Sequence, residues 1–401
     1  MNNIIFDDQS RNSLLPFTHT RPVADIRCGI HTMRTRWEHF LEAGTTTLTA
    51  AHLQPVFTLQ TGNDNLLVNA AVFANEAVVA AIKALQPGQK LVQGQTVIAA
   101  RTDKADLSFN TIDSIFDSLT PVAYEGTVHR LNNAWDIFSQ NDRAIRDDFA
   151  IVTAGRTSAP VPEYVTVVGR ESLFIEPGAV INAGVIINAS TGPVYIGRDS
   201  EILEGCMLRG PISLDEHAVI KMGAKIYAGT TIGPGCKVGG EISNVVFFAN
   251  SNKGHDGYLG NAVIGEWCNL GADTNCSNLK NNYDEVKIWD EHTNKSVRTG
   301  LQFCGLIMGD HSKCGINTMF NTGTVVGVSC NIWGGGFPEK FIPSFSWGGS
   351  EGMTTYQFAR AIDTALRMMA RRGKTLSEAE TEMYRSIFAA TEAQRSLFIN
   401  G

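Results

Sequence analysis

One short stretch of the chain, residues 251–260, places a histidine between glycines: Ser-Asn-Lys-Gly-His-Asp-Gly-Tyr-Leu-Gly. A histidine side chain, with an ordinary pKa of about 6.5, can accept a proton from a reacting group near neutral pH. The flanking glycines let the backbone turn sharply, which suits a loop that carries His255 to a ligand. Loop position alone also fits a solvated histidine. The elements around this stretch must therefore decide between a catalytic base and a surface residue.

The sequence on both sides of this stretch shows a repeat of residue types every six positions. Aliphatic residues recur at this spacing without a slip from Ile196 to Val238, and again in 175–187 and at 264 and 270. Apolar residues, Cys314 and Phe320 among them, keep the same spacing in 308–332. A small residue usually follows four positions later, and glycine often comes directly after the aliphatic residue. This pattern is typical of hexapeptide repeats, whose short strands wind a parallel β-helix and bury their inner face only against neighbouring coils. We predict a left-handed parallel β-helix over residues 165–345.

Two segments interrupt the count. The first follows Val238 and lasts until Ile264, and we interpret it as a loop that leaves the coil and carries His255. The second, residues 277–303, has charges of both signs and is predicted to form an arm against a neighbouring subunit. Insertions of this kind carry chemistry more often than the coils that support them.

Composition excludes several classes of function. The chain has 401 residues and a net charge of −7, which argues against a general attraction to nucleic acid or to an anionic membrane. We find no apolar run of about twenty residues and no signal-peptide pattern, so we expect a cytoplasmic protein without a membrane or nucleic-acid partner. The eight cysteines include no Cys-x-x-Cys pair, and five occupy inward positions of the repeat, which predicts packing.

Two further parts flank the repeat. Residues 1–155 are predicted to form an α/β domain that begins with a buried strand at Ile4–Phe6, and a linker with two prolines follows it. Residues 346–401 are predicted to form C-terminal helices. The helices expected from apolar periodicity are 29–41, 77–85 and 131–146 in the first part and 354–372 and 377–397 in the last.

The first domain contains a segment that resembles a known family. Residues 15–22, Leu-Pro-Phe-Thr-His-Thr-Arg-Pro, resemble the entrance of sugar-phosphate nucleotidyltransferases, in which a glycine-rich loop cradles phosphates. This chain has no glycine before Gly29, and the domain is short. The resemblance implies either a divergent active site or a reduced domain that binds a sugar nucleotide or merely packs. In the active form, Arg11 and Arg21 would grip phosphates, and Asp7 or Asp8 would hold Mg²⁺.

A second resemblance covers about residues 238–332. Lys-Gly-His-x-x-Tyr-Leu-Gly at 253–260, then Asn-Leu-Gly-Ala at 269–272 and Asn-Tyr-Asp at 282–284, resemble the acetyltransferase half of the bifunctional N-acetylglucosamine-1-phosphate uridylyltransferase/glucosamine-1-phosphate acetyltransferase family. With its shortened first domain, the chain resembles an alternative bacterial branch of that family. The resemblance implies His255 as general base. The implied substrate contacts are Lys253, Tyr258, Asn269 and Asn282, and the implied acetyl-CoA contacts are Ala272, Gly309 and Gly323.

Some positions of the match stay open. Either Asn278 or Asn282 fits the family asparagine, and the family's phosphate-binding arginine is absent, so Lys237 or Lys253 would replace it. The implied reaction is acetyl-CoA-dependent N-acylation of an amino-sugar phosphate or nucleotide-sugar, alone or combined with sugar-1-phosphate nucleotidyl transfer. A histidine base suits it because a sugar amine is largely protonated near neutrality.

Two other functions are weighed against acyl transfer. The first is a nucleotidyltransferase whose β-helix serves only to form a homotrimer, the common assembly of such coils. The second is a zinc enzyme of carbonic-anhydrase type, which needs three converging histidines. His217 and His311 hold similar positions in the repeat but are separated by many six-residue repeats.

Overall fold

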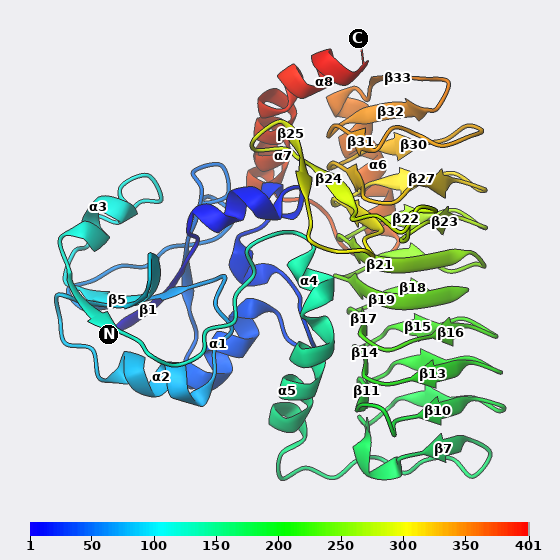
Figure 1. Ribbon diagram of the computed structural model, residues 1–401, viewed down its shortest axis with the longest axis horizontal. Helices are drawn as coiled ribbons and strands as arrows, with labels where there is room; N and C mark the ends of the chain where they lie inside the picture. Colours follow the sequence, from blue (N-terminus) through cyan, green and yellow to red (C-terminus); the bar gives the residue numbers. More distant parts are fainter. Residues whose placement is uncertain (400–401) are drawn as a thin grey trace.

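The structure is a computed structural model that describes residues 1–399 (Figure 1). An α/β domain lies beside a tall stack of short strands, and the C-terminal helices lie against the upper part of that stack. Within residues 1–399, no helix combines the length and the apolar character that a membrane span requires.

The N-terminal domain is built on a six-stranded sheet of order β2-β1-β3-β5-β4-β6. The predicted first strand is confirmed, and it pairs in parallel with both β2 and β3. The strands are β1 (Asn2–Phe6), β2 (Thr46–Leu48), β3 (Asn65–Asn69), β4 (Gln89–Gln93), β5 (Thr96–Thr102) and β6 (Thr120–Ala123). The helices are η1 (Gln9–Leu14), η2 (Phe17–His19), η3 (Val23–Asp25), α1 (Met33–Leu41), α2 (Glu76–Lys83), α3 (Ile112–Asp117), α4 (Asp136–Ser139) and α5 (Asn141–Thr153).

Two predicted helices of this domain differ from the structure. The first helix starts at Met33 rather than at residue 29, because Thr32 closes a capping box with Thr35. The region 131–146 contains no continuous helix: α4 begins at Asp136 and α5 follows it directly.

The predicted coil is confirmed as a parallel β-solenoid with three faces, and its handedness stays a prediction. The first face contains β7 (Thr166–Val168), β10 (Ile186–Asn188), β13 (Met207–Arg209), β16 (Lys225–Ile226), the starts of β19 (Glu241–Phe247) and β21 (Tyr258–Ile264), and a separate pair, β23 (Asn275–Cys276) and β28 (Met319–Phe320). The second contains β8 (Leu173–Ile175), β11 (Val194–Ile196), β14 (Ile212–Leu214), β17 (Thr230–Ile232), the ends of β19 and β21, β26 (Leu306–Met308), β29 (Thr324–Val326) and β31 (Phe341–Ile342). The third contains β9 (Val180–Ile181), β12 (Glu201–Ile202), β15 (Val219–Ile220), β18 (Lys237–Val238), β20 (Asn252–Lys253), β22 (Asn269–Leu270), β27 (Lys313–Cys314), β30 (Asn331–Ile332), β32 (Ser346–Gly349) and β33 (Gly352–Thr355).

The register of the strands explains why inward apolar residues recur every six positions along the chain. Ile202 pairs with Ile220, which pairs with Val238, so equivalent inward side chains stack on one another at the strand spacing of about 4.8 Å. All three are fully buried. The cysteines at inward positions lie in the same core, and all eight cysteines are free and buried.

The interpretation of residues 239–263 as a loop that leaves the coil was wrong. The chain keeps winding there through β19, β20 and β21, and Ile226 pairs with Ile242 as in any other coil. The six-residue spacing of inward residues is interrupted because the long strands β19 and β21 bend round a corner without a separate turn. Asn244 and Asn261 make those bends in the left-handed region, which asparagine tolerates better than most residues.

The second insertion packs against its own chain. Residues 277–303 contain an antiparallel hairpin, β24 (Lys287–Asp290) and β25 (Lys295–Arg298). Trp289 of this hairpin packs on Phe341 of the solenoid and on Phe398 of the last helix. The hairpin is therefore part of the junction between domains within one chain.

The C-terminal part contains α6 (Phe358–Ala370), α7 (Glu378–Ala390) and α8 (Glu392–Ile399). The predicted capping box of Ser377 and Glu380 is confirmed at the start of α7. The single helix predicted for 377–397 is divided at Thr391. The strands β32 and β33 extend the third face beyond residue 345.

The N-terminal domain packs on the second face of the solenoid. Phe17 meets Phe248 with ring centroids 5.0 Å apart, and outward residues of this face join the core of the domain. Next to this contact the buried Arg21 pairs with Glu266 at 2.8 Å and with Asp310. Burial opposes the charge of Arg21, but the two carboxylates more than offset this, so the net shift raises its pKa. The ion pairs thus lock the two domains together.

We expect Arg21→Met to destabilise this junction, because it leaves the carboxylate of Asp310 buried without a cation. Removing one partner of a buried pair lowers the free energy of unfolding by about 3–5 kcal/mol. Urea unfolding followed by tryptophan fluorescence measures the change. As a control, Arg298→Met removes an exposed pair with Glu285 and should cost less than about 1 kcal/mol. Equal midpoints for the two variants would contradict the assigned role of Arg21.

Candidate active site between the solenoid and helix α6

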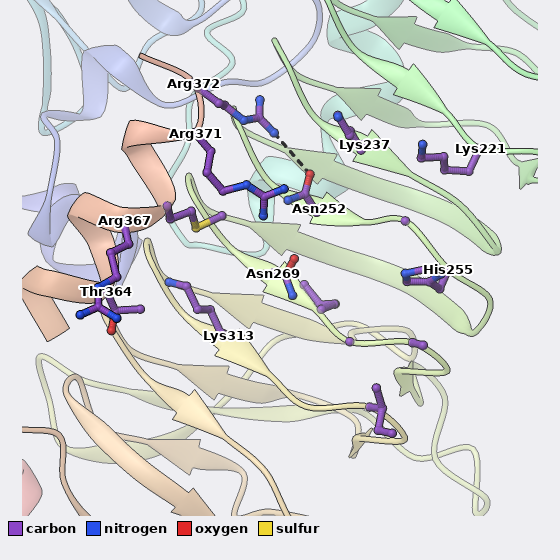
Figure 2. A pocket seen from close by; sticks show the side chains of 16 residues that line it. Lys221, Lys237, Asn252, His255, Asn269, Lys313, Thr364, Arg367, Arg371 and Arg372 are labelled. Atoms are coloured by element: carbon purple, nitrogen blue, oxygen red, sulfur yellow. Dashed lines mark hydrogen bonds between the residues drawn. The ribbon is translucent and has the colours of Figure 1, made fainter. Parts of the chain in front are cut away.

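His255 lies at the corner where the third face turns into the first, between β20 and β21, and its side chain is exposed. It borders a cavity of about 860 Å³ whose floor is the third face and whose opposite wall is α6. Figure 2 shows His255 at one side of this cavity and Arg367, Arg371 and Arg372 of the helix end at the other.

The lining of the cavity is strongly cationic. Three lysines come from the solenoid and three arginines from α6 and the residues that follow it, and the lining contains no aspartate or glutamate. They are Lys221, Lys237, Lys313, Arg367, Arg371 and Arg372. An enclosed surface of one sign concentrates ligands of the opposite sign, so this cavity suits a ligand with phosphate groups.

The repeat explains how the solenoid residues come together. Lys237, Asn252, Asn269 and Lys313 each directly precede an inward residue, so all four point outward on the third face. Strand pairing stacks them in that order, and Figure 2 shows them along successive strands. Gly254 and Gly271 carry no side chain and leave the cavity floor open.

The arginines of the helix end have different environments. Arg372 donates to the side-chain oxygens of Asn250 (3.0 Å) and Asn252 (3.3 Å), which fixes the helix end on the solenoid. Burial lowers the pKa of Arg372. Arg367 pairs with Asp363 on the exposed surface of the helix. Arg371 reaches into the cavity between them (Figure 2).

Lys313 is held more tightly than the other lysines of the lining. Its ammonium donates to the carbonyl of His311 at 2.7 Å. Burial lowers the pKa of Lys313 to about 8, so the side chain is protonated and positively charged below this pH. An anionic ligand beside it would favour the protonated form.

The structure brings together some of the predicted residues and separates others. His255, Asn269 and Ala272 line the same cavity. The Tyr258 hydroxyl lies outside it and accepts from Asn278 at 2.9 Å, whereas Asn282 lies in an exposed loop.

The remaining residues implied for acetyl-CoA binding and for the substrate do not line the cavity. Gly309 lies against Gly327 of the next coil, and Gly323 lies beneath the carbonyl of Lys287 in the hairpin. Lys253 points into the coil and is fully buried. Their assigned ligand contacts stay predictions that this cavity does not support.

The predicted phosphate site of the N-terminal domain is arranged for internal contacts. The Arg11 guanidinium donates to the carbonyl of Thr18 at 2.7 Å, and Arg21 is held by the ion pairs described above. Both side chains therefore already have acceptors within the protein. The prediction that they grip phosphates stays a prediction.

The two aspartates proposed for Mg²⁺ do not fit that ion. The Asp7 carboxylate accepts from the Val23 amide at 2.8 Å and the Thr49 hydroxyl at 2.6 Å. The Asp8 carboxylate accepts from the Ser10 amide and from Arg130, both at 2.9 Å. Burial raises the pKa of Asp7 to about 6, against the opposing charge of Arg11. A hard cation needs free oxygen ligands, and here internal donors occupy them.

The structure gives no support to the zinc alternative. Within residues 1–399, no three histidine, cysteine, aspartate or glutamate side chains gather as a metal-binding group. His311 is buried, with its ring 6.1 Å from Trp267 and 5.6 Å from Tyr384. It therefore has a packing environment at the junction of the solenoid with α7.

The main residues that sequence reasoning missed are the cations of the cavity. Lys221 and Lys313 belong to no motif of the predicted site. For Arg371, Arg372 and Lys374, at the end of the helix expected over 354–372, the sequence favours a solvated helix end that suits the dipole over a site for the 3′-phosphate of CoA. One signal was available for the lysines, because Lys237 and Lys313 both precede an inward residue of the same face. The position of α6 over that face carries no comparable sequence signal.

Comparison with known proteins agrees with the two-part organisation. A family model described as sugar nucleotidyl transferase matches residues 3–157. The N-terminal domain is a sugar nucleotidyltransferase-family domain. Proteins named bifunctional GlmU are among the curated relatives, and together with this family model they confirm the GlmU-like family resemblance inferred from sequence.

Two curated relatives and one solved structure illustrate the similarity. The "Uncharacterized acetyltransferase YaiX" of Escherichia coli O6:K15:H31 is 28% identical over 162 residues, 40% of this chain and 70% of that protein. The "Bifunctional protein GlmU" of Synechococcus elongatus is 27% identical over 195 residues, 47% of this chain but only 38% of its own length. The solved polySia-specific acetyltransferase NeuO covers 48% of this chain and 87% of its own at 15% identity, with a TM-score of 0.27, which is too low to support an argument.

We expect the cavity to bind inorganic pyrophosphate, because its lining offers several cations and no carboxylate. Arg371→Gln and Lys237→Gln should each weaken binding by about tenfold, since a hydrogen bond to a charged group contributes about 1.5 kcal/mol. Isothermal titration calorimetry at low and high salt measures both effects, and added salt should weaken binding. Arg298→Gln, on the distant hairpin, is the control. If all three variants bind pyrophosphate as tightly as the wild type, the anion binds at another place.

Proposed function

We propose that this protein transfers an acyl group from acyl-CoA, with acetyl-CoA as the expected donor, to the amine of a phosphate-bearing amino sugar or nucleotide-sugar. One observation carries the proposal: an exposed histidine borders a large cationic cavity on the third face of the solenoid. Curated relatives named as acetyltransferases and as bifunctional GlmU proteins support the same class of reaction.

The reaction assigns a role to each side of the cavity. The cations of α6 and the third face bind the phosphate groups of the donor and the acceptor. The sugar amine attacks the thioester carbonyl carbon while the imidazole of His255 takes its proton. The carbon–sulfur bond then breaks, and CoA leaves as a thiolate that recovers the proton. Asn269 and Ala272 line the same cavity, which supports the proposal that they contact the substrates.

We also propose a homotrimer for the assembly. The first face of the solenoid exposes four apolar side chains: Val168 (48% exposed), Ile186 (43%), Met207 (49%) and Tyr227 (41%). Exposed apolar side chains on one face favour an interaction surface, and closed symmetry would bury those of each copy. The eight free cysteines support a reducing compartment, which agrees with the expected cytoplasmic location.

Replacing His255 tests the acyl-transfer mechanism. We expect His255→Ala to lower the turnover number by about 10²–10⁴-fold, the usual contribution of a general base. CoA release from acetyl-CoA, measured with a thiol reagent over a panel of amino-sugar phosphates and nucleotide-sugars, gives the rate.

Two controls accompany this experiment. His217→Ala removes an exposed histidine of a lower coil and should leave the rate unchanged. Size-exclusion chromatography with light scattering should give the same mass for wild type and His255→Ala, because the imidazole is exposed. Wild-type turnover in His255→Ala would refute the proposed role of His255.

Nucleotidyl transfer is a second candidate function, favoured by the family model over residues 3–157. The contacts of Asp7, Asp8, Arg11 and Arg21 within the protein argue that these residues hold the domain together instead. We therefore propose that the domain acts as a structural or binding module beside the acyltransferase.

An assay of pyrophosphate release separates these alternatives. With UTP or dTTP, a sugar-1-phosphate and Mg²⁺, we expect no release above a protein-free blank, because internal donors occupy the carboxylates that would bind the metal. An enzyme-coupled phosphate assay with added pyrophosphatase provides the readout. Release above that blank that rises in proportion to the protein concentration would show an active site in this domain.

A further inference from the structure

Lys253 breaks the rule by which the solenoid is built. It occupies an inward position of the third face, where the residues below it are Ile220 and Val238 and the residue above it is Leu270. Its side chain is 0% exposed. A buried ammonium is costly because it loses its hydration, and an aliphatic side chain would suit this position better. The stability of the coil therefore does not explain why a lysine lies here.

The contacts of the ammonium point to the corner that carries His255. The Lys253 Nζ atom donates to the carbonyl oxygen of His255 at 2.9 Å and to that of Asp256 at 3.1 Å. Both carbonyls belong to the corner that follows β20. Because trans peptides hold C=O and N–H antiparallel, the same contacts turn the N–H groups of Asp256 and Gly257 away from the ammonium.

Two neighbouring corners of the same edge are held in a different way. Four positions after the inward residue they carry a threonine, and its hydroxyl donates to a carbonyl of its own corner. Thr274 donates to Gly271 at 2.7 Å, and Thr318 donates to Gly315 at 2.9 Å. The equivalent position of the His255 corner is Gly257, which has no hydroxyl, and a Cβ there would meet the carbonyl oxygen of Thr274 at 2.2 Å. The Lys253 ammonium supplies the donor that this corner lacks.

We propose that Lys253 is a positioning residue of the acyl-transfer site: from inside the coil, its ammonium holds the corner that presents His255 to the cavity. The inference rests on the proposed function, in which the imidazole of His255 removes a proton from the amine. Lys253 touches no substrate in this role, because its ammonium lies on the opposite side of the corner backbone from the solvent. It acts by fixing two peptide planes next to the base.

The role predicts a separation of kinetic effects. In Lys253→Met the coil keeps an inward apolar side chain, but the corner loses both hydrogen bonds from the ammonium. We expect the turnover number to fall by about 10²-fold, the effect of displacing a catalytic group by about 1 Å. The KM for acetyl-CoA should change less than about threefold, because the cationic lining is untouched. Circular dichroism and thermal melting should show a fold at least as stable as wild type, since a buried charge has been removed.

Matched variants show whether any effect belongs to the ammonium. Ile220→Met makes a comparable change at an inward position two strands lower in the same column and should keep wild-type turnover. In Lys253→Ala, added n-propylammonium replaces the missing part of the side chain and should restore turnover in a saturable manner. It should not restore His255→Ala. A purely structural role of Lys253 would give no such rescue.

The pH dependence of turnover offers an independent measurement. Burial lowers the pKa of Lys253 to about 8, while the facing groups Asp256, Cys314 and Asp273 act to raise it. Above this pH the amine loses its proton and with it the strongest contact to the two carbonyls. At saturating acetyl-CoA and acceptor, where loss of the Lys313 charge does not limit binding, turnover should therefore decline as pH rises above about 8, and the decline should be absent in Lys253→Met.

Each outcome decides the inference. Wild-type turnover in Lys253→Met, equal losses in Lys253→Met and Ile220→Met, or a variant that no longer folds would each overturn the positioning role. An inactive His255→Ala beside a fully active Lys253→Met contradicts this inference alone. A fully active His255→Ala contradicts the proposed function and this inference with it.

Discussion

Stacking of inward apolar side chains is the interaction on which this structure depends. Each strand of the solenoid buries one or two such residues, and burial of an aliphatic side chain contributes about 1.5–3 kcal/mol. A single coil cannot achieve this burial, because its inner face is covered only by the coils above and below. Ile202, Ile220 and Val238 therefore stack in strict register, and this register aligns the outward residues of neighbouring strands as well.

The outward alignment is what makes the candidate site possible. Lys237, Asn252, Asn269 and Lys313 are far apart in sequence, yet strand pairing places them in one column about 4.8 Å apart per strand. Helix α6 then covers this column and adds arginines from the opposite side. The cavity exists only because a regular face and a separate helix meet, and neither element would enclose a ligand alone.

Two departures from regularity lie at the corner of His255. Gly257 occupies a position where the two corners above have threonine, and Lys253 replaces an aliphatic residue. Each departure has a cost in local stability. Proteins commonly accept such costs at functional sites, where geometry matters more than the stability of the element. The N-terminal domain differs, because its buried ion pairs serve the contact with the solenoid.

The amino-acid sequence by itself determined the solenoid, the α/β character of the first domain, and His255 as the leading candidate for catalysis. The first two features depend on local spacing, and a period of six with small corner residues is visible without any long-range information, whereas the role of His255 rests on the resemblance of residues 253–260 to an acetyltransferase family. Tertiary structure decided what period alone could not: that residues 239–263 keep winding through coils shortened by bent strands, that Lys253 points inward, and that Arg21 is enclosed by Asp310 and Glu266. The physical reason is that burial and ion pairing depend on which surfaces meet, and residues more than 200 positions apart, such as Arg21 and Glu266, meet only in the folded chain.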